Sequence, residues 1–426
     1  MKDNNKILHK DNGEPQCQYF VLRKKRLCRM TVKPGKQYCG EHEPQPTADD
    51  DQDTKRIPCP NDPKHTCYAS KLEKHLKICN ARQQDEPEYI IHNVNLGPSE
   101  EDYQHRPLTQ VPPETLLRVV DKINSFYNEY LIDSITEETE KPIHSSVMQE
   151  FSEDGRSESS LRHLRQVSSL LHLVEGAGLV QPNTCYIDLG AGKGQLGVYA
   201  CRTWTAAGGG VVLLERAALR HKRDRHAAPA LRDSPAPRDS PALTRLRHDL
   251  AHVSLAHVPA VRAADNVVGL AKHLCGAATD FALRALAAAQ EAGGVGARAG
   301  AGRVAGAVLA TCCHHRVHPA HYVATHTLQT HGFGAEELDV VLGVVSWATC
   351  GDGRPRAARG AGLGGGEVGR AETGRRAKAV LDWGRVQYLR ERGFTARLVR
   401  FVSPRVMPEN VCIVASREPP APAPVR

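Results

Sequence analysis

Residues 187–197 of this 426-residue chain read Ile187-Asp188-Leu189-Gly190-Ala191-Gly192-Lys193-Gly194-Gln195-Leu196-Gly197. An apolar run over 185–189 leads into three glycines that alternate with other residues. This order predicts a strand that ends in a glycine-rich turn. Counted from Gly192, the glycines also match the G-x-G-x-x-G pattern of dinucleotide sites, so they do not by themselves identify a ligand.

Short apolar runs alternate with helical or loop stretches beyond this motif. They cover residues 211–214, 267–271, 304–310 and 338–345. The alternation predicts an α/β fold in which helices cover a mostly parallel sheet. Helical spacing of apolar residues predicts further helices from Pro113 and over 161–174. At the end, residues 379–393, 396–402 and 411–415 predict a helix followed by a closing antiparallel hairpin.

The composition excludes several classes of protein. Hydrophobic residues make up 40% of the chain, and no stretch approaches the roughly 20 apolar residues that span a bilayer. The first residues also lack the apolar run of a secretory signal. We therefore expect a protein of the nucleus or the cytoplasm. In such a reducing compartment the thirteen cysteines, six of them within residues 1–80, indicate metal ligation or burial rather than disulfides.

The net charge of +8 is unevenly distributed along the chain. Residues 1–80 hold 16 Lys and Arg against 11 Asp and Glu, residues 81–170 hold 8 against 17, and residues 171–426 hold 32 against 20. Basic clusters release counterions when they neutralise phosphates, so nucleic acid is the leading candidate partner. A solvated surface would give the same counts, so the charge alone does not decide.

A first metal module is expected near the N-terminus. Its spacing is Cys-x10-Cys-x10-Cys-x2-His, at Cys17, Cys28, Cys39 and His42. Three thiolates and one imidazole complete a tetrahedral zinc shell. The basic run between its first two ligands, where we expect contacts with RNA, is Arg23-Lys24-Lys25-Arg26. The alternative is a structureless basic arm, but a segment with so little apolar core needs a metal to fold.

A second metal module follows a Pro/Asp-rich linker. Its expected ligands are Cys59, His65, His75 and Cys79. Residues 69–79 predict a helix, which places the last two ligands four positions apart on one face. Leu72 and Leu76 would form its small core, and Cys67 fits no ligand position. The module resembles the CHHC zinc finger of RNA-associated proteins.

These patterns divide the chain into four parts. We expect a CCCH-type zinc finger at 14–45, a CHHC-type finger at 56–82, a linker at 83–112 and one large domain at 113–420. Biased composition predicts inserted surface loops at 229–242, 292–303 and 351–376.

The acid two residues before the first glycine makes the central motif D-x-G-x-G-x-G. It resembles motif I of class I S-adenosylmethionine (SAM) methyltransferases, which have a Rossmann-like fold. The residues that would bind SAM are Asp188, Gly190, Gly192, Gly194, Glu215 and Asp249. Glu215 would accept hydrogen bonds from the ribose hydroxyls, and Asp249 would contact the adenine amino group. A single acid at one of these positions is also compatible with a solvated strand end, but their order and spacing favour the cofactor.

Two unusual clusters follow the next two apolar runs. They are Lys272-His273-Leu274-Cys275-Gly276 and Thr311-Cys312-Cys313-His314-His315-Arg316. Ligands of doubly wound sheets bind beyond the carboxyl ends of the strands, so both clusters should face the same crevice as the glycines. A third zinc at 312–315 is an alternative. Four consecutive residues do not easily converge on one ion, so packing and substrate contacts are favoured there.

Taken together, these motifs resemble one family nearly end to end. They include both fingers, the glycine motif, residues 272–280, the Cys-Cys-His-His-Arg run, residues 346–351 and residues 384–389. The family is that of the tRNA:m(4)X modification enzymes, which 2′-O-methylate the ribose of the fourth nucleotide of the tRNA acceptor stem. The resemblance implies SAM as methyl donor, two structural zinc ions, and tRNA rather than DNA or a membrane as partner of a monomer. The chain departs from the family pattern at Val317-His318-Pro319 and Gly343-Val344.

A ribose hydroxyl is a poor nucleophile and must lose its proton during transfer. His273 is the candidate proton acceptor, and Lys272 would orient the hydroxyl or stabilise its developing charge. Alternatively, His273 is a packed residue and positioning suffices. Two rival functions remain open: an RNA-binding adaptor with an inactive methyltransferase fold, and a methyltransferase acting on a protein or a small molecule.

Overall fold

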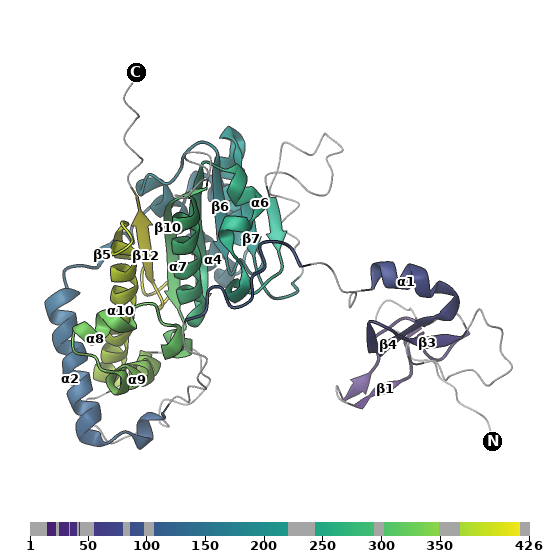
Figure 1. Ribbon diagram of the computed structural model, residues 1–426, viewed down its shortest axis with the longest axis horizontal. Coiled ribbons are helices and arrows are strands. Elements are labelled where there is room, and N and C mark those ends of the chain that lie inside the picture. Colours follow the sequence, from purple (N-terminus) through teal and green to yellow (C-terminus); the bar gives the residue numbers. More distant parts are fainter. Residues whose placement is uncertain are drawn as a thin grey trace. The chain divides into compact units, whose positions relative to one another are not determined.

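The computed structural model describes ten stretches of the chain, in two compact units, Met1–Glu86 and Pro87–Arg426 (Figure 1). The described residues are 15–22, 25–33, 35–40, 42, 55–79, 86–97, 106–219, 243–293, 302–348 and 367–417.

The described residues of the N-terminal unit form two small modules with little regular structure. Strands β1 (Phe20–Val21) and β2 (Arg26–Leu27) form an antiparallel pair in the first module. In the second, β3 (Arg56–Cys59) pairs with β4 (Asp62–Tyr68), and α1 (Leu72–Ile78) follows. No residue of α1 is buried. Apolar packing therefore contributes little here, as expected for modules that rely on a metal.

Among the described residues of the C-terminal unit, eight strands form one mixed sheet in the order β5-β11-β12-β10-β9-β6-β7-β8. Their bounds are β5 Thr136–Glu137, β6 Thr184–Leu189, β7 Gly209–Leu214, β8 Leu243–Leu246, β9 Asn266–Cys275, β10 Arg303–Cys312, β11 Thr395–Arg400 and β12 Val411–Ser416. Strands β6 to β10 pair in parallel, whereas β12 lies antiparallel between β10 and β11.

Helices cover both faces of this sheet. On one face lie α6 (Pro259–Ala263), α7 (Ala277–Gly293) and α10 (Glu367–Arg390). Three further helices of the same core pack against α10: α2 (Pro113–Tyr130), α8 (Thr325–Thr330) and α9 (Ala335–Val344). On the other lie α3 (Ser145–Phe151), α4 (Glu158–Gly176) and α5 (Gln195–Trp204). Successive strand residues alternate between the two cores: Ile187 packs into the first and Tyr186 into the second. Figure 1 shows α7 and α10 running across the first face.

Most of the predicted elements are confirmed, but one is wrong. The runs at 185–189, 211–214, 267–271 and 304–310 lie in β6, β7, β9 and β10, and the final helix and antiparallel hairpin are α10, β11 and β12. The run at 338–345, expected to be a strand, lies in helix α9. Glu337 Oε2 accepts a hydrogen bond from the Gly334 amide at 3.1 Å, which starts the helix one turn before the apolar run. Strand β8 was not predicted.

The expected linker at 83–112 is shorter than predicted. Residues 87–97 belong to the C-terminal unit, where Ile90 bridges to Val253. Asn95 is 1% exposed, and its amide donates to the carbonyl oxygens of Leu250 at 2.6 Å and Val253 at 2.8 Å. Two side-chain hydrogen bonds and a backbone bridge therefore fix this segment to the sheet domain.

The three expected insertions lie largely outside the described residues, which omit 220–242, 294–301 and 349–366. The third is shorter than predicted, because residues 367–376 begin helix α10. In the part of the chain that the structure describes, no helix is both long and apolar enough to span a bilayer.

Candidate functional site

The glycine-rich turn joins β6 to α5 at the carboxyl edge of the sheet. Gly190, Gly192 and Gly194 have φ angles of 69°, 53° and 77°, a region that residues with side chains rarely adopt. A Cβ on Gly194 would lie 2.7 Å from the Arg245 Nη2, whereas nothing lies within 4 Å of a Cβ on Gly192. The turn is therefore closed at Gly194 and open at Gly192, where a ligand can approach the backbone.

Asp188 lies beneath this turn. It is 2% exposed, and its Oδ2 accepts a hydrogen bond from the Gly197 amide at 2.9 Å. Burial raises the pKa of Asp188 to about 7, against the opposing effects of the Gly197 amide and the charges of Lys272 and Arg245. In this structure Asp188 holds the first turn of α5 against the end of β6.

The two other predicted acids lie beyond the neighbouring strands, beside the turn. Glu215 follows β7, and its carboxylate accepts hydrogen bonds from the amides of Gly192 at 3.0 Å and Ala217 at 2.8 Å. Asp249 follows β8 and accepts from the Arg216 guanidinium at 3.2 Å. Glu215 is thus hydrogen-bonded to the glycine turn, and its neighbour in sequence, Arg216, is hydrogen-bonded to Asp249. These contacts connect the three along one edge of the sheet.

Lys272 and His273 occupy the end of β9, next to the turn. A Cβ on Gly190 would lie 4.0 Å from the His273 carbonyl oxygen. The Lys272 Nζ lies 3.2 Å from His163 Nδ1, and the His273 Nε2 lies 3.2 Å from the Gln166 Oε1. Burial, followed by the charge of Lys272, lowers the pKa of His273 to about 4. The imidazole is therefore neutral at physiological pH and can accept a proton.

Sequence reasoning missed three residues of this edge. His163 and Gln166 are on α4 and reach the site only because that helix packs across β9. Their three-residue spacing places both on one helix face, but the sequence does not show which face meets the sheet. Arg245 is on β8 and donates to the Gly192 carbonyl oxygen at 3.3 Å. No sequence signal identified it, because β8 itself was not predicted.

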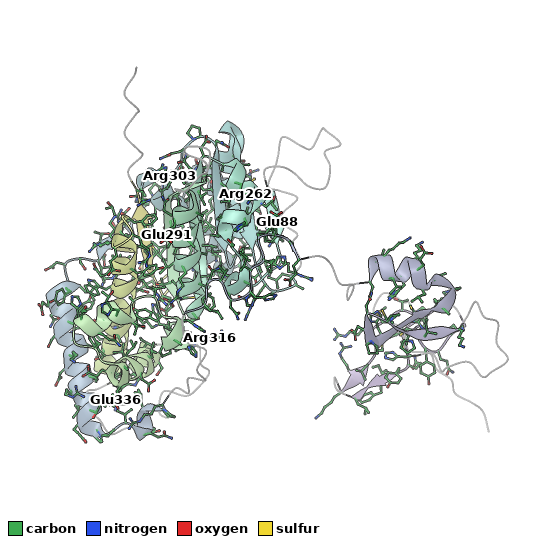
Figure 2. All side chains as sticks on the ribbon, in the orientation of Figure 1. Glu88, Arg262, Glu291, Arg303, Arg316 and Glu336 are labelled. Carbon is green, nitrogen blue, oxygen red and sulfur yellow. The ribbon has the colours of Figure 1, made fainter. Side chains whose placement is uncertain are left out.

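The Cys312–His315 run does not converge on one point. His314 is 2% exposed, and its Nε2 lies 2.9 Å from Asp382 Oδ2. Cys312 instead meets Cys275, with 3.3 Å between the sulfurs. Arg303 and Arg316, at the start of β10 and beyond its end, lie at opposite ends of the sheet and mark its amino and carboxyl edges (Figure 2).

A buried ionic network lies behind the same edge. The Arg385 guanidinium is 1% exposed and donates to Asp280 Oδ2 at 2.7 Å and to Asp382 Oδ1 at 2.9 Å. Asp280 is on α7, while Arg385 and Asp382 are on α10. Although Asp382 is buried, the neighbouring His314 and the Arg385 guanidinium lower its pKa to about 2. The network therefore holds the turn that follows β10 against both helices.

The predicted ligands of the first module converge. Cys17, Cys28 and Cys39 are buried, and their sulfurs lie with the His42 Nδ1 within 4.8 Å of one another. The ring of Tyr19 stacks on the His42 imidazole at 4.0 Å between centroids. Such a closed set of three thiols and one imidazole matches a structural zinc site.

The second module gathers its four predicted ligands in the same way. Cys59 and Cys79 have sulfurs 3.6 Å apart, and the Nε2 atoms of His65 and His75 are 3.2 Å apart. Cys67 is buried but does not belong to the cluster. Of the predicted RNA contacts, Lys25 and Arg26 are described, with Arg26 in β2, whereas Arg23 and Lys24 lie outside the described residues.

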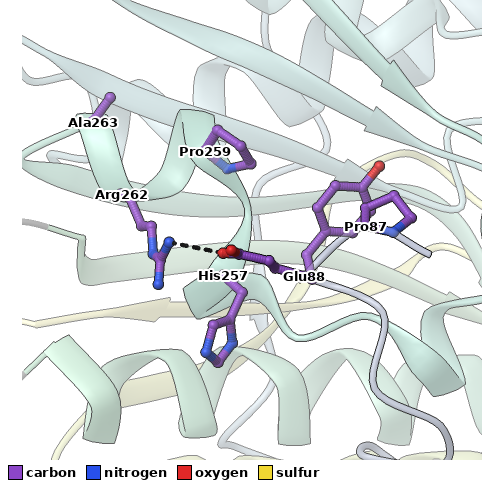
Figure 3. A pocket seen from close by; sticks show the side chains of 7 residues that line it. Pro87, Glu88, His257, Pro259, Arg262 and Ala263 are labelled. Atoms are coloured by element: carbon purple, nitrogen blue, oxygen red, sulfur yellow. Dashed lines mark hydrogen bonds and ion pairs between the residues drawn. The ribbon is translucent and has the colours of Figure 1, made fainter. Parts of the chain in front are cut away.

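The C-terminal unit has a surface pocket of about 470 Å³ (Figure 3). It is lined by Pro87, Glu88, Tyr89, His257, Pro259, Arg262 and Ala263. Arg262 pairs with Glu88 at 3.5 Å, and α6 ends three residues before β9 begins, so the pocket is near the amino edge of the sheet. None of the predicted cofactor or catalytic residues lines it.

Comparison with known proteins assigns this architecture to a family. Residues 165–416 match methyltransferase TRM13, residues 15–43 the CCCH zinc finger in TRM13 protein, and residues 56–80 the U11-48K-like CHHC zinc finger. The tRNA:m(4)X modification enzyme TRM13 homolog of Mus musculus is 32% identical and that of Homo sapiens 31%, over 94% and 95% of both chains respectively. The TRM13 enzyme of Eremothecium gossypii is 28% identical over 96% of both chains. The chain belongs to the TRM13 methyltransferase family.

Proposed function

We propose that this protein uses SAM to 2′-O-methylate the ribose of the fourth nucleotide in the tRNA acceptor stem. The observation that carries the proposal is the meeting of two elements at one edge: the open glycine turn after β6 and the Lys272-His273 pair at the end of β9. The curated relatives are named as tRNA:m(4)X modification enzymes, which supports the substrate.

The sheet supports SAM as the cofactor. Without β5, the seven strands from β6 to β12 lie in the order β11-β12-β10-β9-β6-β7-β8, and only β12 runs antiparallel to its neighbours. Class I methyltransferases have the same order of seven strands. Gly192 leaves open space, and the Glu215 carboxylate beside it is partly exposed, so the edge fits an adenosine with its ribose hydroxyls. The cofactor supplies an electrophilic methyl group. Glu215 and Asp249 would orient it, and Asp188 would act indirectly by holding the turn.

Lys272 and His273 would then assist the removal of the proton from the ribose hydroxyl. Because the His273 Nε2 faces the Gln166 oxygen, its Nδ1 is the proton acceptor. A pKa of about 4 keeps His273 neutral but makes it a weak base. The positive charge of Lys272 compensates by stabilising the developing alkoxide. Proton removal therefore requires both residues.

The two zinc modules would deliver the RNA. Each would hold one structural zinc ion, and Lys25 and Arg26 would contact phosphates. Removing residues 1–80 should leave SAM binding intact but weaken tRNA binding and flatten its salt dependence. Equal tRNA affinity of the truncated and full chains at near-physiological salt would contradict this role.

Incubation with tritiated SAM and either total tRNA or total protein tests the reaction class. Label in tRNA, and protection of one linkage from alkaline cleavage, are expected because a 2′-O-methyl group blocks that cleavage. Label in protein would favour the protein methyltransferase. tRNA binding without label would favour the inactive adaptor.

His273→Ala should lower the single-turnover rate by about 100-fold or more, with SAM affinity nearly unchanged. The matched control is His326→Ala, which removes an exposed imidazole from α8. A normal rate in His273→Ala would leave positioning alone as the explanation of catalysis.

A further inference from the structure

Three thiols from two strands meet at the carboxyl edge of the sheet. Cys275 ends β9, Cys312 ends β10, and Cys313 follows immediately. The sulfurs of Cys275 and Cys312 are 3.3 Å apart, and all three lie within 4.8 Å of one another. Neither metal module contributes to this cluster.

The backbone is shaped to bring the third thiol in. Consecutive side chains of an extended strand point to opposite faces, so Cys312 and Cys313 would diverge if β10 simply continued. Cys313 instead has a φ of 49°, one of four positive φ angles among the described residues other than glycine. A residue with a Cβ adopts this conformation at an energetic cost that the surrounding structure must offset. Here it turns the third sulfur toward the other two.

The partner strand is held in matching register. Cys275 is the register partner of Cys312 after an irregularity in the β9–β10 pairing. The next residue, Gly276, donates its amide to the Cys312 carbonyl oxygen at 3.3 Å. A Cβ on Gly276 would lie 2.5 Å from the Arg316 Cβ, so only glycine permits this close approach. The three thiols therefore lie in a fixed frame.

The spacing of the sulfurs in this frame is close to, but slightly shorter than, that in the two finger sites. The cysteine sulfurs there are 4.0 Å apart for Cys28 and Cys39, and 3.6 Å apart for Cys59 and Cys79. A tetrahedral zinc ion with Zn–S bonds of about 2.3 Å places its sulfurs about 3.8 Å apart. A modest widening of the Cys275–Cys312 pair would give the same geometry.

We infer that Cys275, Cys312 and Cys313 bind a third zinc ion, whose fourth coordination position is open to solvent. Cys275 is exposed, whereas Cys312 is buried, so the cluster opens on the Cys275 side. Three protein ligands with an open fourth position distinguish this site from the closed finger sites. A disulfide between Cys275 and Cys312 would use only two of the sulfurs and would not account for the positive φ of Cys313, which brings the third sulfur to the cluster.

Native mass spectrometry of the full chain, purified with a phosphine reductant, tests the site without reference to methyl transfer. Three zinc ions are expected in the unmodified chain and in Cys201→Ser, and two in Cys275→Ser and in Cys313→Ser. Cys201 is a matched control because it is a buried cysteine on α5 outside all clusters. Two ions in the unmodified chain, or three in both cluster variants, would overturn the inference.

Alkylation provides a readout that needs no variant. Cys275 is exposed and should react rapidly with iodoacetamide when no metal is bound. We expect peptide mapping to show slow modification of Cys275 in the zinc-loaded chain and at least 10-fold faster modification after removal of zinc by a chelator. Equal rates before and after removal would overturn the metal site, as would a chain lighter by two hydrogens with Cys275 linked to Cys312.

Discussion

The Asp188→Asn substitution tests the electrostatics beneath the glycine turn. Burial raises the pKa of Asp188 from 3.8 to about 7, so over this interval the folded chain keeps a proton that the unfolded chain releases. Stability contributed by this group is therefore lost as the pH rises from about 4 to about 7. At about 1.4 kcal/mol per pH unit, the loss amounts to about 4 kcal/mol. Asparagine keeps the size and an acceptor oxygen for the Gly197 amide but does not titrate.

Urea unfolding followed by tryptophan fluorescence measures this effect. Trp204, Trp347 and Trp383 are the only tryptophans and all belong to the C-terminal unit, so the signal excludes the metal modules. Between pH 4 and pH 8 the unmodified chain should lose up to about 4 kcal/mol more free energy of unfolding than Asp188→Asn. The exposed Asp133→Asn serves as the control and should follow the unmodified chain. If the curves of Asp188→Asn and the unmodified chain run parallel, the assigned environment of Asp188 is refuted.

Three further substitutions test packing around the site by the same unfolding assay. Gly194→Ala should lower the free energy of unfolding by about 1–3 kcal/mol. The loss should exceed that in Gly155→Ala, because Gly155 has a similar φ of 73° but a Cβ there would meet nothing within 4 Å. Equal losses would exclude crowding as the cause. Arg385→Met removes the ion-pair partner of the buried Asp280 and one of the partners of Asp382. It should lower the free energy of unfolding by about 3–5 kcal/mol, against about 0–1 kcal/mol for the exposed Arg375→Met. Asn95→Ala removes two buried hydrogen bonds to carbonyl oxygens and should lower the free energy of unfolding by about 1–3 kcal/mol. An unchanged unfolding midpoint would contradict the anchoring role of Asn95.

The fold was predictable where hydrophobic pattern and strand length agreed. The four runs of the parallel core are short and mostly apolar, and all four form strands. The run at 338–345 has the same composition, yet it forms α9, with Leu338, Val341 and Val344 buried. A short apolar run buried on all sides carries no periodicity, so its flanking residues must decide. Here Gly334 and Glu337 supply the helix start.

The site was predictable where its residues are neighbours in sequence. The predicted ligands of the two metal modules lie within 26 and 21 consecutive residues, and their spacing alone was enough to predict that they cluster. The cysteine cluster joins positions 37 residues apart. Cys275 becomes a neighbour of Cys312 and Cys313 only because β9 and β10 pair in a particular register. Spacing within one segment contains no information about that register.

The position of β12 in the sheet has a consequence for synthesis of the chain. β10 is complete at Cys312, but β12, its partner on one side, begins only at Val411. At roughly 5–20 residues per second, the ribosome needs about 5–20 s to make the intervening segment. During that time the edge of β10 that β12 will cover has no partner strand, and such an apolar edge is prone to pair with other chains. The nascent sheet domain should therefore depend on chaperones during this interval, whereas the metal modules, complete by Cys79, can fold earlier.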